Sequence, residues 1–212
     1  MITYFLKYYD KLITALLEHL QLVFISLLFS LVLATIITTV CLYFDKLSKI
    51  MLGVTSMIYS VPSLAMFAIL IPLTGLGKTT AIIVLVVYNQ YLLLRNFLTG
   101  LNEVDRSVIE AATGMGMKKS QTLVLIQIPL AKKALFTGIR LALVSTIGIA
   151  TIAASINAGG LGTILFDGLR TMNTNKIIWG SILAAGLAVV TNYTLDYIER
   201  TYDKRQMKEG RP

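Results

Sequence analysis

The segment GLGKTT, Gly75–Thr80, contains the residue types of a phosphate-binding loop. In such a loop, glycine amides cradle the phosphates, a lysine neutralises their charge and a hydroxyl binds magnesium. The full motif has its first glycine five residues before Gly77, and that position is Pro72 here. The motif also follows a β-strand, whereas a long apolar block precedes it in this chain. We therefore expect GLGKTT to form an ordinary turn rather than a nucleotide site. Any ATP chemistry would then take place in a separate chain.

Residues for other kinds of catalysis or for metal binding are sparse. His19 is the only histidine and Cys41 the only cysteine, and no acidic cluster accompanies His19. A metal site or a histidine-activated nucleophile needs more such groups than these. The apolar blocks have no Asp or Glu at their centres, which argues against aspartate-based intramembrane proteolysis and against a proton-coupled carrier acting alone. We expect a chain that is not an enzyme and binds no metal or cofactor.

Long apolar blocks dominate the remaining sequence. The chain has 212 residues, of which 56 % are hydrophobic and 14 % charged, and its mean hydropathy is +0.75. A soluble domain carries about a quarter charged residues. Each block has about 20 residues, which as a helix crosses about 30 Å of hydrocarbon. The composition predicts an all-α, polytopic membrane protein with about five spans, at Leu20–Phe44, Ile50–Leu73, Thr80–Leu101, Ala134–Ile156 and Ile177–Leu195.

Some segments are expected to differ from a simple series of straight spans. Pro62 and Pro72 make the second block the one expected to kink. The apolar stretch Gln121–Ala131 is too short to span and predicts an interfacial or protein-covered helix. Met1–His19 is amphipathic and is not followed by a cleavage signature, so residues 1–19 are expected to form an uncleaved helix on the membrane surface. The spans then occupy residues 20–200, and residues 201–212 form a basic tail.

The net charge of +8 predicts an orientation. Five spans put the two ends of the chain on opposite sides of the membrane. One side carries 12 Lys and Arg residues, in the loop Asp45–Lys49, the loop over residues 102–133 and the C-terminal tail, against 5 on the other. The positive-inside rule places the richer side in the cytoplasm, so the N-terminus is expected outside and the C-terminus inside. This distribution explains the positive charge without a nucleic-acid partner.

The loop over residues 102–133 is long and contains its own helix signals. Ser107 and Glu110 form an S-x-x-E capping box, which predicts a helix starting at Ser107. Gly114 and Gly116 are expected to end that helix. An apolar face of small and medium residues then points to the cytoplasm, formed by Val108, Ala111, Ala112 and Met115. This helix has two possible roles. It is a surface helix of the loop and nothing more, or it docks in a groove of another protein.

A longer pattern favours docking. Glu110-Ala111-Ala112, three residues, Gly116, nine residues and then Ile126-Gln127-Ile128-Pro129 resembles the E-A-A, x3, G, x9, I-x-L-P signature of ABC importer permeases. Ile128 replaces the leucine of that signature. "YSVPSLAMFAILIPLTGLG" and "INAGGLG" resemble the osmoprotectant branch, which imports glycine betaine, carnitine or choline. Methionine-importer permeases share the five-span plan and a similar Gly-Leu-Gly element, so a methionine or other amino-acid importer remains the alternative.

The resemblance implies a type I importer permease fold and a set of partners. These are a cytoplasmic ABC ATPase dimer that uses ATP and Mg²⁺, a second identical or homologous permease, and an extracytoplasmic solute-binding protein, all at a bacterial cell membrane. The loop helix would be the coupling helix that sits in the ATPase. The residues assigned to this coupling are Ser107, Glu110, Ala111, Ala112, Gly114, Gly116 and Pro129.

Polar and glycine positions near the spans are candidates for a translocation path. Polar side chains in spans either join helices or line a path, and sequence does not decide between these roles. An aromatic face such as that of Tyr59 attracts quaternary ammonium. The candidate path residues are Tyr59, Ser60, Pro62, Asn89, Asn157, Gly159 and Gly160. A different class of protein, a membrane scaffold or channel subunit without ATP-driven transport, would present a similar cytoplasmic helix.

Overall fold

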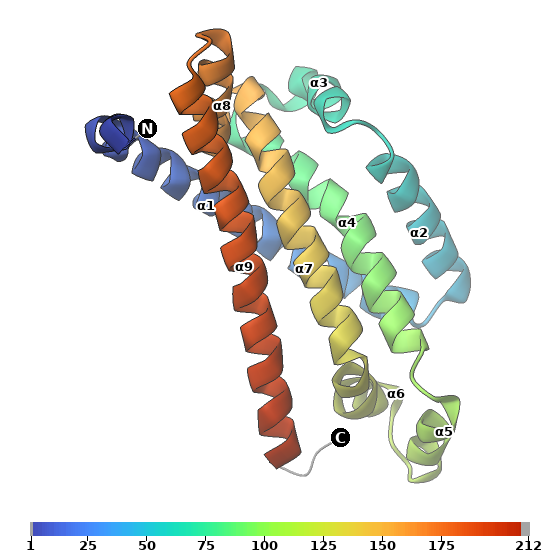
Figure 1. The fold of residues 1–212 in the computed structure, drawn as a ribbon. Helices are drawn as coiled ribbons and strands as arrows, with labels where there is room; N and C mark the ends of the chain where they lie inside the picture. The colour runs from blue at the N-terminus through green and yellow to red at the C-terminus, as the bar shows by residue number, and fades with distance from the viewer. Residues whose placement is uncertain (1, 209–212) are drawn as a thin grey trace.

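The computed structural model describes residues 2–208, and within this range every regular element is a helix (Figure 1). The predicted all-α class is thus confirmed. Met1 and residues 209–212, the end of the expected basic tail, lie outside the described residues. The elements are α1 (Ile2–Cys41), α2 (Asp45–Tyr59), α3 (Ser63–Thr74), α4 (Lys78–Asn102), α5 (Arg106–Gly114), α6 (Lys119–Thr122), a π-helical turn (Leu123–Gln127), α7 (Ile128–Ile152), a 3₁₀ turn (Ala153–Ile156), α8 (Leu161–Arg170) and α9 (Thr174–Lys208).

Helix α1 is continuous through residue 19, where the sequence suggested a boundary. Its one break in helical geometry is at Tyr8, with φ −126° and ψ 19°. No Gly or Pro occurs between residues 2 and 41, so nothing in the backbone interrupts the helix near His19. The expected surface helix and the first span are therefore parts of one helical element.

The second apolar block is broken as its prolines predict. Helices α2 and α3 meet at an angle of 98° across residues 60–62, and Pro62 is the residue before α3. A proline disfavours helical geometry in the residue that precedes it, which ends α2 near Tyr59. Pro72 lies inside the last turn of α3 without breaking it. Four helices are long and apolar enough to cross a membrane, or five when the α2–α3 pair counts as one span, which agrees with the predicted number.

The stretch Gln121–Ala131 is not the separate short helix expected from its length. Helix α6 passes through the π-helical turn directly into α7, forming one apolar segment over Lys119–Ile156. Pro129 lies in the first turn of α7, directly after the π-helical turn, and the helical path continues through it. The loop after α4 is therefore joined to α7 by a continuous helical path.

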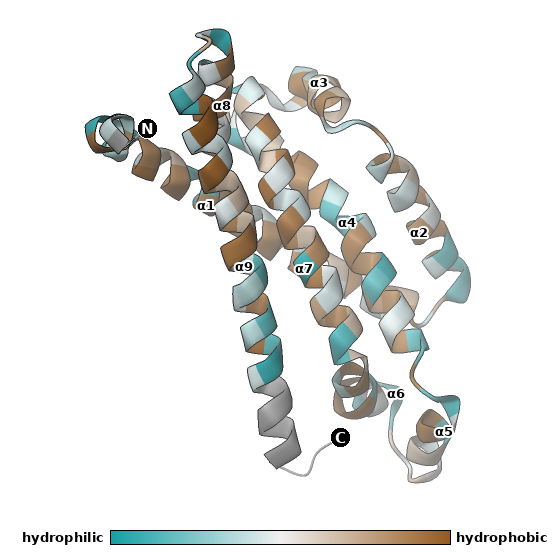
Figure 2. Cartoon of the chain, viewed as in Figure 1, coloured by the Kyte–Doolittle hydropathy of each residue, from teal (hydrophilic) through white to brown (hydrophobic). Residues whose placement is uncertain are grey.

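Helix α4 is the centre of the bundle. It packs most extensively against α7 and α1, and also against α2 and α3. Leu85 belongs to a buried cluster with Phe67 and Ile147, while Leu93 and Leu94 belong to a second cluster nearer α5. By contrast, large apolar side chains on α1 and α9 remain exposed, and Figure 2 shows these apolar residues along the outer helices. Hydrocarbon chains or other subunits must cover such surfaces.

Helices α5 and α8 mark opposite ends of the molecule (Figure 1). At the α8 end, Gly162 packs directly against the end of α7. A Cβ atom at residue 162 would overlap the carbonyl oxygen of Thr151 and lie 2.7 Å from the Cβ of Ala154. Glycine is thus required here by close packing of α8 on the α7 backbone.

We predict that Gly162→Ala lowers the free energy of unfolding by about 1–3 kcal/mol, the usual cost of overpacking. Thermal unfolding of the purified chain in detergent measures this change. Gly148→Ala in α7 is the matched control, because no atom lies within 4 Å of a Cβ at that position. The control is expected to be neutral or to stabilise by up to about 1 kcal/mol, the gain from replacing a helical glycine. Equal destabilisation by both variants would contradict this account of Gly162.

Candidate functional site

Helix α5 begins earlier than the capping-box pattern predicts. Asp105 is the N-cap residue, and its Oδ1 accepts a hydrogen bond of 2.8 Å from the Ser107 N–H. This hydrogen bond lowers the pKa of Asp105 below its ordinary value, because it stabilises the charged carboxylate. Glu110 instead pairs with Arg106, with 3.0 Å between Oε1 and Nε. The Ser107–Glu110 capping box is therefore wrong, since an aspartate two residues upstream already caps the helix.

The glycine stop at the other end of α5 is confirmed. The last helical residue is Gly114, and Gly116 has φ +85°, in the left-handed region that favours glycine. The N–H of Gly116 donates to the Thr113 carbonyl at 2.9 Å, and the N–H of Met117 donates to the Ala112 carbonyl at 3.1 Å. These bonds satisfy the carbonyl groups that the helix end leaves open and turn the chain back toward α6.

The predicted apolar face of α5 packs partly against the rest of the chain and partly faces solvent. Ala112 is completely buried against the rest of the chain. Val108, Ala111 and Met115 face outward, and the Met115 side chain is 75 % exposed. Glu110 is also exposed. Within the described chain this outward surface has no partner, and it is open for contact with another protein.

The inner face of α5 rests on a small hollow of about 300 Å³. Its walls include Ile109 from α5, Tyr43 from the turn after α1, and Leu123 from the π-helical turn. The amide of Gln127 donates to the Leu101 carbonyl at 3.4 Å, which ties this turn to the end of α4. Pro129, assigned to coupling from the sequence, lies apart from α5 in the first turn of α7. The π-helical turn that leads into α7 is thus tied to the end of α4.

The candidate path residues Tyr59, Ser60 and Pro62 lie together at the bend between α2 and α3. The Tyr59 ring is half-buried and lies 5.7 Å from the ring of Tyr88 and 5.1 Å from that of Tyr91. The Tyr88 hydroxyl donates to the Val61 carbonyl, so α4 holds the bend directly. The sequence pattern indicated Tyr59 alone, whereas the fold gathers three tyrosine rings at this point.

Asn89 lies away from this group, in the interior between helices. Its Nδ2 donates to Ser30 Oγ of α1 at 3.0 Å and to Thr146 Oγ1 of α7 at 2.8 Å. Only 1 % of the residue is exposed. These contacts join three helices and match the helix-joining alternative that the sequence left open.

The remaining candidates, Asn157, Gly159 and Gly160, form the turn before α8. Asn157 is exposed and has φ +66°, while Gly160 has φ +81° and is buried. The Gly160 N–H donates to the carboxylate of Glu18 on α1 at 3.0 Å, and a Cβ at residue 160 would lie 2.9 Å from His19 Nδ1. Close approach of α1 therefore explains the glycine at 160.

Residues 75–77 of the GLGKTT segment form the turn between α3 and α4, as expected, and residues 78–80 begin α4. The Thr80 hydroxyl hydrogen-bonds to the Gly75 carbonyl and to Thr74 Oγ1, so it is engaged within the turn. Among residues 3–201, whose side chains the structure describes, no three His, Cys, Asp or Glu come close enough to hold a metal ion. The candidate site is made up of the outward surface of α5 and polar contacts between helices.

Comparison with known proteins identifies the architecture. Residues 26–208 match the family described as "Binding-protein-dependent transport system inner membrane component". The chain belongs to this family. It is the permease subunit of an ABC importer, as the E-A-A pattern suggested.

Relatives with assigned functions support the same placement. The permease is 38 % identical over 166 residues to the carnitine transport permease protein OpuCB of Listeria monocytogenes, covering 78 % of this chain and 76 % of that one. It is 34 % identical over 183 residues to the choline transport system permease protein OpuBB of Bacillus subtilis, covering 86 % and 84 %. An inward-facing structure of the MetNI methionine ABC transporter has the same fold, with TM-score 0.83, 22 % identity, and coverage of 90 % of this chain and 95 % of that one.

One interhelical contact of the permease has no counterpart in the sequence analysis. The guanidinium of Arg140 on α7 lies 2.7 Å from Glu199 and 3.6 Å from Asp196. Both acids are on α9, beyond the apolar block expected there. Opposite charges near the same end of two spans were the available signal, although sequence alone does not show which helices are neighbours.

We predict that Asn89→Ala lowers the free energy of unfolding of the permease by about 1–2 kcal/mol, the size of interhelical hydrogen bonds in membranes. Asn96→Ala on the same helix is the matched control, since Asn96 Nδ2 donates only to the Leu92 carbonyl of α4, at 2.7 Å. Thermal unfolding in detergent compares the two variants. If Asn89→Ala leaves stability unchanged but abolishes uptake, Asn89 acts in the path rather than in joining helices.

Proposed function

We propose that this permease imports a compatible solute with a quaternary ammonium group, such as glycine betaine, carnitine or choline. The names of its relatives support this class, because they include carnitine and choline transport permeases. The three tyrosines at the α2–α3 bend add chemical support. Aromatic faces attract quaternary ammonium through their electron-rich surfaces, and Tyr59, Tyr88 and Tyr91 provide several such faces in one place.

The outward surface of α5 is the observation that carries the coupling part of this proposal. It presents Glu110, Ala111 and Met115 to the exterior of the chain, next to a sharp glycine turn. A small, smooth helix of this kind fits a groove on a partner. We assign that groove to a cytoplasmic ABC ATPase dimer, which would bind the ATP and Mg²⁺, while the permease binds neither.

The orientation follows from the distribution of charge. With α5 in the cytoplasm, the Lys- and Arg-rich loops and the C-terminal end of α9 lie inside, and the α8 end lies outside. A solute-binding protein would then approach the α8 end, and a second permease, identical or homologous, would cover part of the exposed apolar surface. The chain would thus work in a bacterial cell membrane with its N-terminus outside.

In the mechanism proposed from this geometry, movement of α5 is transmitted to the translocation path through α4 and α7. Helix α5 follows α4 in the chain and leads through α6 and the π-helical turn into α7, and Gln127 of that turn donates to the Leu101 carbonyl of α4. Movement of α5 by closing ATPases would therefore tilt α4 and α7 together. Because Asn89 joins both helices to α1, the three would tilt as one body and change the side from which the path is open.

For the solute, we predict that unlabelled glycine betaine, carnitine or choline reduces uptake of labelled glycine betaine by the reconstituted importer, whereas methionine does not. Tyr59→Leu should lower uptake several-fold, because cation–π contacts contribute about 0.5–2 kcal/mol. Tyr59→Phe keeps the ring and is the matched control, expected to retain uptake. Competition by methionine with no effect of the three quaternary amines would place the permease among amino-acid importers instead.

For coupling, we predict that Glu110→Ala reduces both uptake and solute-stimulated ATP hydrolysis without lowering the stability of the permease. Its ion pair with Arg106 is exposed, with 69 % and 90 % of the side chains accessible, and such pairs contribute less than about 1 kcal/mol. Arg106→Ala removes the same ion pair and is the control, expected to keep coupling. Co-purification with the ATPase provides a second readout. Normal ATPase association and stimulation in Glu110→Ala would contradict the assignment of α5.

A further inference from the structure

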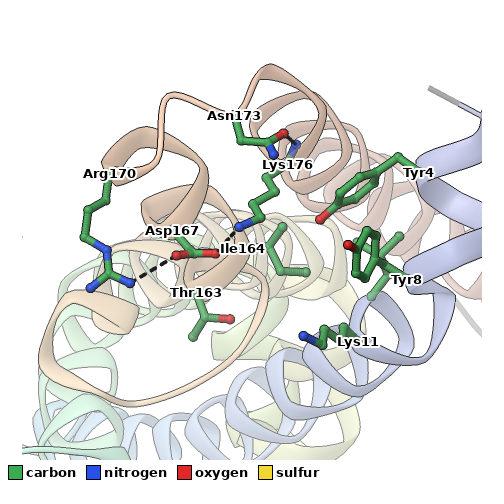
Figure 3. Close-up of a pocket in the computed structure, with 10 residues that line it drawn as sticks. Tyr4, Tyr8, Lys11, Thr163, Ile164, Asp167, Arg170, Asn173 and Lys176 are labelled. Carbon is green, nitrogen blue, oxygen red and sulfur yellow. Dashed lines mark hydrogen bonds and ion pairs between the residues drawn. The ribbon is translucent and has the colours of Figure 1, made fainter.

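A polar cavity lies at the α8 end of the permease, opposite the coupling helix. Its volume is about 610 Å³, and its walls come from the first turns of α1, from α8 and from the first turn of α9. Figure 3 shows Tyr4 and Tyr8 on one side, Asp167 and Lys176 on the other, and Lys11 reaching from α1 into the space between them. Neither the coupling surface nor the tyrosines at the α2–α3 bend border this cavity.

The cavity carries an excess of positive charge. Lys11, Arg170 and Lys176 line it, and Asp167 is the one acid among its lining residues. Asp167 already pairs with Lys176 at 2.5 Å and with Arg170 at 3.1 Å. These hydrogen bonds hold the pKa of Asp167 below its ordinary value, so the carboxylate is charged and engaged.

Of the three cations that line the cavity, Lys11 is the one that does not pair with Asp167. Among the described residues it forms no ion pair, and its ammonium lies 5.7 Å from the centre of the Tyr8 ring. Asp10 and Glu18 line a neighbouring hollow that shares Lys11, but Glu18 accepts the Gly160 N–H. The cavity is therefore suited to an anionic group near Lys11, with tyrosine rings beside it.

The surroundings of the cavity indicate where that anion comes from. The elements that form the cavity also carry exposed apolar side chains, including Leu6 on α1 (68 % exposed), Leu169 on α8 and Met172 in the α8–α9 turn (86 % exposed). Lys176 lies in the first turn of a helix apolar enough to span the membrane. Tyrosine and lysine beside apolar residues at the end of a span are typical of the membrane–water interface.

We propose that this cavity binds the phosphate headgroup of an anionic phospholipid in the leaflet at the α8 end. Lys11 and Lys176 would face the phosphate, the rings of Tyr4 and Tyr8 would pack beside the glycerol region, and the acyl chains would lie along the exposed apolar side chains. A soluble anion would gain nothing from those apolar side chains. The N-terminal part of α1 would then be held to α8 and α9 partly by the lipid.

The only tryptophan of the chain provides a local probe. Trp179 lies one turn after Lys176, and its ring centre is 4.8 Å from that of Phe5 on α1. The experiment uses the full-length permease in detergent, titrated with brominated phosphatidylglycerol or with brominated phosphatidylcholine of the same chain length. Bromine quenches tryptophan emission at short range, so quenching reports lipid close to this cavity.

The expected result is quenching by phosphatidylglycerol at a several-fold lower mole fraction than by phosphatidylcholine. Lys11→Gln should reduce this preference roughly fivefold, the effect of one cation near an anionic surface, and Lys11→Arg should retain it. Lys7→Gln is the matched control, because Lys7 also lies over the Tyr8 ring, at 5.4 Å, but does not line the cavity. It is expected to keep the preference.

Three results would overturn the proposal. Equal quenching by the two lipids in the unaltered permease would show that the headgroup charge is not recognised. An equal loss in Lys7→Gln and Lys11→Gln would show general attraction to the membrane surface rather than binding in the cavity. Recovery of emission on adding soluble glycerol phosphate at millimolar concentration would assign the cavity to a free anion.

Discussion

Hydrocarbon offers no hydrogen-bond partners, and this constraint decides how the helices of the permease are held together. A polar side chain between spans is stabilised by a partner on another helix or on its own backbone. Asn89 bonds to Ser30 and Thr146 in this way, which fixes α1, α4 and α7 relative to one another. Because α4 and α7 also flank the loop that carries α5, this helix is linked to the bundle core at both of its ends.

The sequence was sufficient for features that depend on local physical chemistry. Apolar length located the spans, Pro62 located the bend between α2 and α3, and Gly116 located the end of α5. The spacing from Glu110 to Pro129 led to the family that the comparisons confirm. Each of these signals acts within a few residues of the chain or within one motif, so it can be read without the fold.

Features that depend on which elements meet were not predictable in this way. The sequence pattern indicated Ser107 at the start of α5, whereas the structure caps this helix with Asp105. The polar residues assigned together to a path divide into the Tyr59 group at a bend and Asn89 in the interior, because adjacent positions on α4 face different neighbours. The pairing of Arg140 with Glu199 spans 59 residues and requires knowing that α7 lies beside α9.

The hydrogen bond between Glu18 and the Gly160 amide has a consequence for biogenesis. Its two partners are separated by 142 positions in the chain. During synthesis, the helix bearing Glu18 leaves the ribosome long before the turn that supplies the amide, so this carboxylate stays hydrated or finds temporary partners while the intervening helices insert. The contact between the first helix and this turn therefore forms only after Gly160 has emerged.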